Sequence, residues 1–255
     1  MRVSRDLEAS LAEPAGDGVF SEVDLDGLHS SVRKYFAAAI APGTPLAVSA
    51  RLQMRGRIKI GRWLPFRARQ VLTPHRGTVW AARVGGVIVG SDRYAAGHGG
   101  MDWKVGGLVT VMHAEGPDVS RSSAERAAGE AFWVPTSLLP RFGVKWTATD
   151  DAHISACFDV DEHAVQVNYH IADDGHIRSL VFERWGDPDN TGKWELHPFG
   201  GAVTDYKTFD GVTVPSAGRV GWFFGTDRWE QGEFFRYRIT DLRLVTTETS
   251  MREER

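Results

Sequence analysis

Residues 48–60 of the chain read VSARLQMRGRIKI, and this stretch decides the fold class. Its apolar residues alternate with Ser, Arg, Gln and Lys, which is the period of a strand with one buried and one solvent-facing side. Gly61 and Arg62 then form a tight connection, so residues 63–72 are predicted to return as the second strand of a hairpin. The sequence therefore predicts an antiparallel sheet.

Turn signals separate further strand-like runs on both sides of a helical segment. An antiparallel sheet of about ten or more strands tends to curl into a barrel or half-barrel. We therefore predict an α+β fold with a single curled antiparallel β-sheet, built from residues 48–107 and 144–245. Its other strands are expected at residues 78–84, 87–95, 145–148, 153–160, 164–171, 177–185, 201–209, 213–224 and 234–245.

A helical insertion over residues 108–140 is predicted to cover the concave side of this sheet. The segment is rich in Ala and Glu, and Ser122 with Glu125 fits a capping box at a helix start. Pro135 and Pro140 interrupt the pattern, which predicts two short helices joined by a kink.

All these elements are expected to belong to one barrel-like domain, residues 23–245, because no linker or internal repeat separates them. An amphipathic helix is predicted near its start, over residues 26–41, from apolar residues at helical spacing. Residues 1–22 mix Gly, Pro and charged residues without a sustained period, so we expect a flexible arm there. The polar residues 246–255 are expected to form a flexible tail.

Composition excludes several classes of protein. The 255 residues carry 30 Lys+Arg and 33 Asp+Glu, and a net charge of −3 argues against a dedicated nucleic-acid binder. A single cysteine, Cys157, allows no intramolecular disulfide. No run resembles a secretory signal or a membrane span, so a cytoplasmic protein is expected. The sequence also lacks metal-ligand spacings, nucleotide loops and nucleophile motifs, so no metal and no cofactor are expected.

Aromatic residues are abundant, with nine Trp and thirteen Phe spread over nearly every element. In a curled sheet these rings either fill the interior or line a pocket for a large, mostly apolar small molecule. Both alternatives are compatible with the sequence. If a pocket exists, the candidate ligand-binding residues are Trp63, Trp80, Met101, Trp103, Trp133, Arg184, Trp222 and Tyr237.

Glu130 is the main candidate for chemistry in such a pocket. It lies three residues before Trp133 in the helical insertion, so the two side chains project to neighbouring positions. A carboxylate beside indole rings loses water and suits a general acid or base, whereas a solvated helix glutamate is the alternative. The stripe that carries Arg126 and Gly129 is expected to face away from the sheet.

Two further residues complete the candidate catalytic set. Tyr94 can aim its hydroxyl inward, although a tyrosine in a sheet is more often a packing residue with its tip in water. Asp102 can take part in proton transfer or form a structural ion pair with Arg184. The candidate catalytic residues are therefore Glu130, Tyr94 and Asp102.

A basic segment coincides with the first predicted hairpin. Eight Arg and Lys residues lie between Arg51 and Arg76, with no Asp or Glu among them. The simpler interpretation is a solvated outer face that protects the sheet from aggregation. The alternative is a docking patch, from Arg51 to Arg69, for an acidic protein partner or an anionic surface.

Several motifs resemble known families. The pattern DY-x3-DGV-x-VP at residues 205–215, followed by ITDL at 239–242, is similar to the C-terminal half of the bacterial lipoprotein-carrier half-barrels. Residues 28–245 resemble an uncharacterised bacterial family, a domain of unknown function, through blocks at residues 63–66, 93–101 and 130–140. The resemblance implies a half-barrel fold and does not imply an activity.

Two functions from different classes follow. The leading hypothesis is a cofactor-independent cyclase or isomerase that holds a polyketide-like metabolite in a reactive conformation. The alternative is a non-catalytic carrier or sensor of a lipid-like ligand. A cyclase needs a closed pocket with a buried titratable group, whereas a carrier needs an open mouth.

Overall fold

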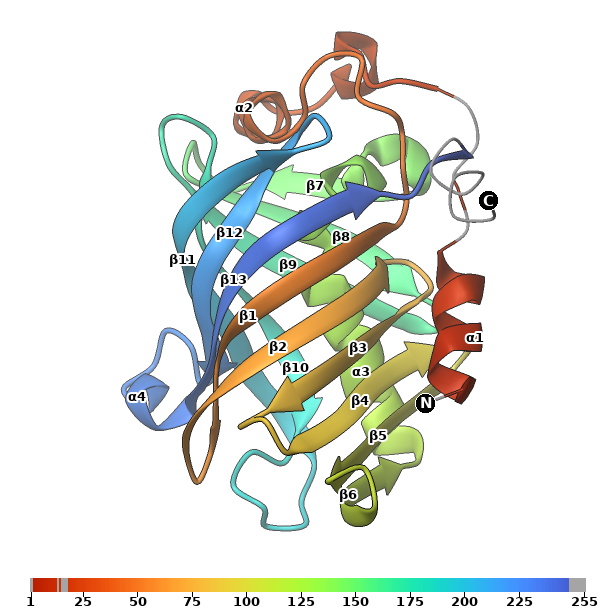
Figure 1. Ribbon diagram of the computed structural model, residues 1–255. Coiled ribbons are helices and arrows are strands. Elements are labelled where there is room, and N and C mark those ends of the chain that lie inside the picture. Colours follow the sequence, from red (N-terminus) through yellow and green to blue (C-terminus); the bar gives the residue numbers. More distant parts are fainter. Residues whose placement is uncertain (1, 13, 15–17, 248–255) are drawn as a thin grey trace.

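One antiparallel sheet of 13 strands, curled but not closed, dominates the computed structural model (Figure 1). The structure describes residues 2–12, 14 and 18–247. The strands are β1 Ala50–Ile60, β2 Arg62–Thr73, β3 Gly77–Val84, β4 Ile88–Ala95, β5 His98–Val105, β6 Val109–Glu115, β7 Lys145–Ala148, β8 His153–Val160, β9 His163–Ile171, β10 Ile177–Gly186, β11 Glu195–Phe209, β12 Val212–Trp222 and β13 Glu233–Leu244.

The strand order is β6-β5-β4-β3-β2-β1-β13-β12-β11-β10-β9-β8-β7. Strands that are consecutive in the chain pair with each other, except β6 and β7, which form the two edges of the sheet. Strand β1 also pairs with β13, with Ala50 opposite Leu244. This single long-range pairing joins the N-terminal hairpins to the C-terminal strands in one sheet. The predicted α+β fold with one curled antiparallel sheet is confirmed.

Helix α3, Pro117–Gly129, packs against β4, β5, β9 and β10 on the concave side. Three short 3₁₀ turns follow it: η2 Ala131–Trp133, η3 Pro135–Leu138 and η4 Pro140–Phe142. The predicted start of the helix is wrong, because Pro117 occupies its first turn and Ser122 lies in its middle. Residues 109–115 form the edge strand β6 instead of a helix. Most of its residues are exposed, so no alternation of burial marks it in the sequence.

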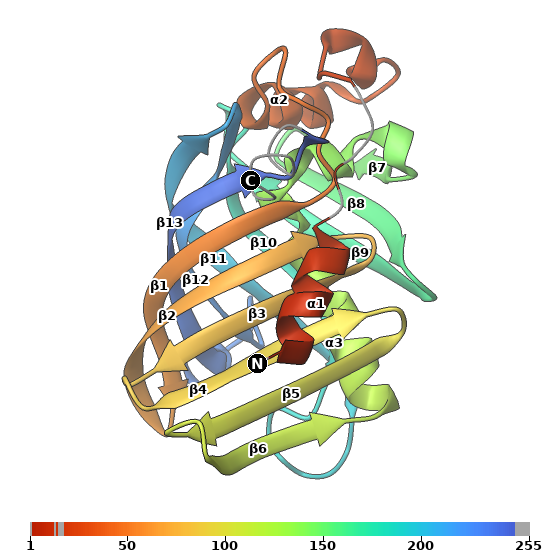
Figure 2. The same ribbon diagram turned by 45° about the vertical axis from the view of Figure 1, so that its right-hand side comes forward.

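The remaining helices lie outside the concave face. Helix α2, Ser30–Ala39, lies at one end of the sheet and fulfils the helix predicted over residues 26–41, and the 3₁₀ turn η1, Glu22–Leu25, precedes it. A short helix, α4, Trp229–Gly232, precedes β13. The expected arm differs from the structure, because helix α1, Arg2–Leu11, packs on the outer face of β2, β3 and β4 (Figure 2). The predicted tail lies mostly outside the described residues.

Small residues set how closely α3 approaches the sheet. Gly97, in the turn between β4 and β5, has φ +79°, whereas Gly99 lies within β5. A Cβ atom at Gly99 would lie only 2.6 Å from the Cα atom of Ser120 in α3. The glycine run therefore serves close packing of the helix on the strand.

No helix among the described residues is long and apolar enough to cross a membrane.

Candidate functional site

A cavity of about 400 Å³ lies between α3, the turn η2 and the sheet. It is lined by residues of β1, β3–β5 and β10–β13, together with the loop between β10 and β11. Most of the lining is apolar and aromatic, which is typical of sites for small molecules. The aromatic side chains in the lining are Trp80, Phe132, Trp133, Phe182, Trp194, Phe199, Trp222, Phe234, Phe235 and Tyr237.

A charged cluster lies on the helix side of this cavity. The Nε atom of Arg126 donates to Oε1 of Glu130 at 2.8 Å, and its Nη1 atom donates to Oδ2 of Asp92 at 2.9 Å. Gln70 donates to the second oxygen of Glu130 at 2.5 Å. The Trp103 indole donates to the second oxygen of Asp92 at 2.9 Å. Each oxygen of these two carboxylates thus accepts a hydrogen bond.

The charges of this cluster stabilise one another. Burial alone would lower the pKa of Arg126, but the negative charges of Glu130 and Asp92 raise it above its ordinary value. The Arg126 guanidinium also lies 5.4 Å from the Trp80 ring, within the range of a cation–π interaction. Arg126 therefore stays protonated and neutralises part of the negative charge beside the cavity.

Arg184 is the second cation of the cavity, and its environment differs. Its Nε atom donates to the main-chain oxygen of Ser122 at 3.1 Å, and its guanidinium lies over Phe199 at 4.4 Å and Trp222 at 5.1 Å. Within the described part of the chain it forms no ion pair with a carboxylate. Burial, together with the positive charge of Arg126, lowers the pKa of Arg184 to about 10. Arg184 is still protonated at neutral pH, so an anion in the cavity would gain a partner there.

Trp133 and Tyr237 form another part of the cavity wall. The Trp133 indole donates to the main-chain oxygen of Pro215 at 3.0 Å, which fixes the ring. Its ring meets that of Tyr237 edge-on at 5.2 Å. Burial raises the pKa of Tyr237, so its hydroxyl stays protonated.

A family model matches residues 18–234, and that family is described as a family of unknown function (DUF6544). The chain belongs to the DUF6544 family. This match confirms the resemblance to a domain of unknown function, and it assigns no activity to the cavity.

Two solved structures are similar to the DUF6544 chain. The first is described as a "putative outer membrane lipoprotein-sorting protein domain" from Vibrio parahaemolyticus, with 9% identity, 81% of this chain and 90% of that chain covered, and a TM-score of 0.41. The second is a LolA superfamily protein from Nitrosomonas europaea, with 8% identity, coverages of 84% and 92%, and a TM-score of 0.39. A likeness of this size carries no argument about function. No curated protein sequence matches the chain.

Most of the predicted binding residues of this DUF6544 chain meet at the cavity, as does one of the three predicted catalytic residues. Their functional roles stay predictions. The predicted residues that line the cavity are Trp80, Met101, Glu130, Trp133, Arg184, Trp222 and Tyr237.

Tyr94 does not line the cavity, so its predicted placement there is wrong. The side chain is fully buried, and its hydroxyl donates to Oδ2 of Asp161 at 2.7 Å. Burial and this hydrogen bond raise the pKa of Tyr94 above its ordinary value. The residue therefore ties β4 to the turn between β8 and β9.

Asp102 lies on the outer face of β5, so its placement at the cavity and its pairing with Arg184 are also wrong. Arg93 donates to Asp102 and, at 2.6 Å, to Glu115, and His113 lies 2.6 Å from Asp102. Partial burial alone would raise the pKa of Asp102, but the hydrogen bonds from His113 and Arg93 lower it below its ordinary value. Ligand atoms of Asp102, His113 and Glu115 lie within 4.8 Å of one another, but the Arg93 guanidinium already forms ion pairs with both carboxylates.

Two tryptophans also lie elsewhere than expected. Trp63 lies under the Arg236 guanidinium, 4.5 Å from it, on the outer face of the sheet. Trp103 is buried against the Trp80 ring, with centroids 5.7 Å apart, but does not line the cavity itself.

Sequence reasoning missed the residue at the centre of the charged cluster. Arg126 and Gly129 line the cavity, although they were expected to face away from the sheet. The signal was present, because Arg126 lies four residues before Glu130 and such pairs share one face of a helix. Asp92 was also missed. Its inward orientation follows from its pairing opposite Trp80 in the sheet.

Proposed function

We propose that this protein binds an amphiphilic small molecule that has an apolar body and an acidic head, and that it acts as a carrier or sensor without catalysis. The observation that carries the proposal is Arg184, a cation without a carboxylate partner among the described residues, in a cavity lined mainly by aromatic rings. The apolar body gains free energy by leaving water, at about 25 cal/mol per Å² before the costs of binding. The acidic head pairs with Arg184.

Catalysis by Glu130 is less well supported. A general acid or base needs a carboxylate oxygen free to reach the substrate. One Glu130 oxygen accepts from Arg126 and the other from Gln70, and Tyr94 and Asp102 lie outside the cavity. These contacts favour a carrier over a cofactor-independent cyclase or isomerase.

Titration with a long-chain fatty acid and with the alcohol of equal chain length, followed by tryptophan fluorescence, tests the proposal. Arg184→Met is expected to weaken binding of the acid roughly 10- to 100-fold, because a hydrogen bond to a charged group contributes about 1.5–3 kcal/mol. Binding of the alcohol is expected to change less than about threefold. Equal losses for acid and alcohol would show that Arg184 does not recognise the head.

Adjacent residues of β11 provide a matched pair for the cavity itself. Val203 lines the cavity, whereas Thr204 is exposed. Val203→Trp is expected to abolish binding of both ligands, and Thr204→Trp is expected to leave it unchanged. Binding that survives in Val203→Trp, with the fold intact by circular dichroism, would contradict the assignment of the cavity as the binding site.

A further inference from the structure

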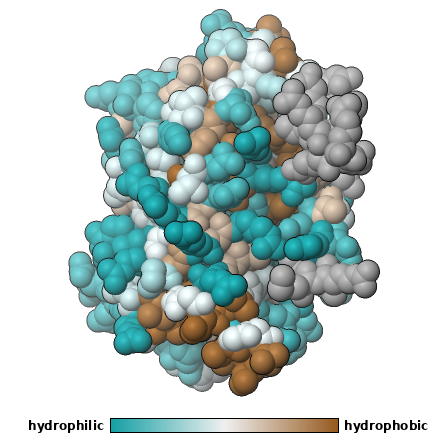
Figure 3. Space-filling view, in the orientation of Figure 1, coloured by the Kyte–Doolittle hydropathy of each residue, from teal (hydrophilic) through white to brown (hydrophobic). Residues whose placement is uncertain are grey.

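Exposed apolar side chains gather at one end of the half-barrel. Leu108 is 86% exposed, Val109 is 65% exposed and Val87 is 57% exposed, and all three lie at or beside hairpin turns. Figure 3 shows a group of hydrophobic residues at the lower end of the molecule, where Figure 1 places the turns of the β1–β2, β3–β4 and β5–β6 hairpins. An exposed apolar patch of this kind marks an interaction surface.

The turns themselves do not require these residues. Paired glycines at Gly85–Gly86 and Gly106–Gly107 supply the positive φ angles of two tight turns. Val87 and Leu108 follow them directly, at positions where a polar side chain would serve the turn equally well. Their apolar character therefore has a reason outside the fold.

The cavity reaches the same end of the molecule. Its lining includes Ile58, two residues before the end of β1, and residues Asp187, Pro188, Asn190 and Trp194 of the β10–β11 loop. Figure 1 shows this loop at the same end of the molecule as the hairpin turns. A surface that meets the exposed tips would therefore lie next to the part of the cavity formed by the loop.

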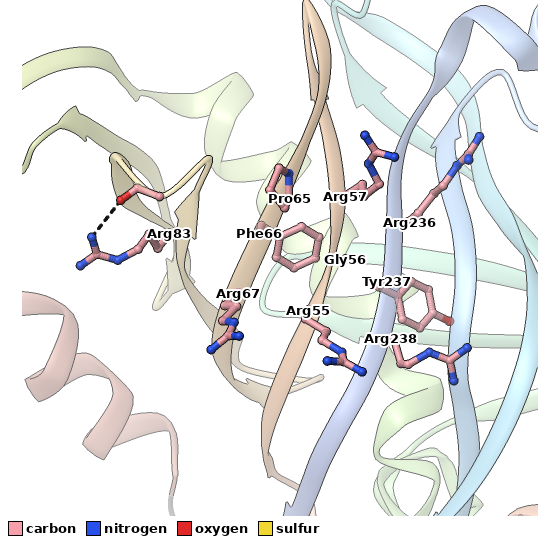
Figure 4. Close-up of a pocket in the computed structure, with 11 residues that line it drawn as sticks. Arg55, Gly56, Arg57, Pro65, Phe66, Arg67, Arg83, Arg236, Tyr237 and Arg238 are labelled. Atoms are coloured by element: carbon pink, nitrogen blue, oxygen red, sulfur yellow. Dashed lines mark hydrogen bonds between the residues drawn. The ribbon is translucent and has the colours of Figure 1, made fainter.

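A row of arginines crosses the outer face and begins at Arg83, next to the β3–β4 turn. Arg83, Arg67, Arg55 and Arg238 pair directly with one another across β3, β2, β1 and β13. With Arg57 and Arg236 they line an open groove of about 670 Å³ (Figure 4). We call these four paired residues the arginine row.

The arginine row is electrostatically unfavourable in the isolated protein. Like charges directly opposite one another in a sheet repel. Arg238 is compensated by Asp205, but Arg55 and Arg67 have no carboxylate partner in the described part of the chain. An external polyanion would relieve this repulsion.

From these two features we infer that this end of the protein docks on an anionic lipid bilayer. The hairpin tips insert Val87, Leu108 and Val109 among the lipid chains, and the arginine row lies against the anionic headgroups. The inference rests on the proposed function, because docking would bring the cavity to a source or acceptor of an amphiphilic ligand.

Other occupants fit these features less well. A second copy related by a two-fold axis would present the same patch and place its arginine row near the first. An acidic protein would satisfy the arginines but would leave the protruding tips without an apolar environment. A bilayer supplies both negative charge and hydrocarbon.

Cosedimentation with vesicles tests the inference. The protein is expected to bind phosphatidylcholine vesicles that contain phosphatidylglycerol at least tenfold more tightly than pure phosphatidylcholine vesicles. The double variants Leu108→Ser/Val109→Ser and Arg55→Glu/Arg67→Glu are each expected to weaken binding at least tenfold. Val23→Ser and Arg178→Glu, exposed changes outside the patch and the arginine row, serve as controls that leave binding unchanged.

Three results would overturn the inference. They are the absence of binding to either vesicle, full binding by both double variants, and a stable dimer by sedimentation that the Leu108→Ser/Val109→Ser variant disrupts. Absence of vesicle binding would indicate that the arginine row binds an acidic protein instead. Val203→Trp separates this inference from the proposed function, because it blocks the cavity but is expected to bind vesicles like the wild type.

Discussion

Arg126→Met tests whether the charged cluster beside the cavity is the ion-pair network that the geometry indicates. Removal of the guanidinium leaves the carboxylates of Asp92 and Glu130 facing an aromatic cavity without their cation. Breaking a fully buried ion pair costs about 3–5 kcal/mol. The side chains of Arg126 and Asp92 are each 19% exposed and that of Glu130 is 16% exposed, so solvent screens part of this cost. We expect a loss of about 2–4 kcal/mol.

Urea unfolding, followed by tryptophan fluorescence and by far-ultraviolet circular dichroism, measures this loss at pH 7. A thermal scan should show a midpoint roughly 4–16 °C lower, since 1 kcal/mol corresponds to about 2–4 °C in a chain of this size. Adding Asp92→Asn and Glu130→Gln to Arg126→Met is expected to recover about half of the loss, because no unpaired charge remains. The exposed Arg178→Met is the control and should change stability by less than about 0.5 kcal/mol.

Two outcomes would refute the reasoning. A cost below about 1 kcal/mol for Arg126→Met would mean that solvent already satisfies both carboxylates. Additive losses of unfolding free energy for Arg126→Met and Glu130→Gln would mean that the two side chains do not interact. Substitutions of contacting residues give non-additive free-energy changes in a double-mutant cycle.

Three further outcomes are expected. The hydrogen bond from Arg219 lowers the pKa of Glu233 to about 2 in the folded protein, below its unfolded value of 4.5. The ionised Glu233 side chain therefore stabilises the folded state above pH 4.5, and this stabilisation is lost as pH falls toward 2. Urea titrations of the wild type and Glu233→Gln should differ at pH 7 and converge near pH 2. Arg55→Glu should change the free energy of unfolding by less than about 0.5 kcal/mol or raise it, and a large loss would mean that the side chain faces inward. Gly129→Ala places a Cβ atom 2.3 Å from the Phe182 ring and should destabilise by about 1–3 kcal/mol in urea, with partial rescue by Phe182→Leu.

Strands whose burial alternates clearly could be predicted from the sequence almost to the residue, whereas β11 begins six residues before its predicted start. In β8, His153–Val160, the buried residues Ile154, Ala156, Phe158 and Val160 alternate with exposed or half-buried ones. The predicted bounds of this strand and of β7 coincide with the structure. Strand β6 was missed because it lies at the edge of the sheet, and most of its residues are exposed on both faces.

The position of the helix over the sheet was predicted correctly, but the face of the helix that points to the sheet was not. The hydrophobic residues of α3 are mainly alanines, so the helix has only a weakly apolar stripe. The positions of its polar residues therefore do not show which face points to solvent. Arg126, Glu130 and Ser122 all line the cavity from this helix or its end. Their inward orientation depends on the partners that the sheet supplies, above all Asp92 and Gln70, which lie far away in the sequence.

Alternation along a strand determines the face of a residue but not its distance from a cavity. Tyr94 and Asp92 share the inner face of β4, yet only Asp92 lines the cavity, while Tyr94 reaches Asp161. What separates them is the path of α3, which is held close to the sheet where Gly99 and Gly129 leave room for it. A larger residue at either glycine would displace the helix or the facing ring. The aromatic character of the cavity lining could therefore be predicted from the sequence. The size and position of the cavity could not, because they depend on the spacing between α3 and the sheet that these two glycines permit.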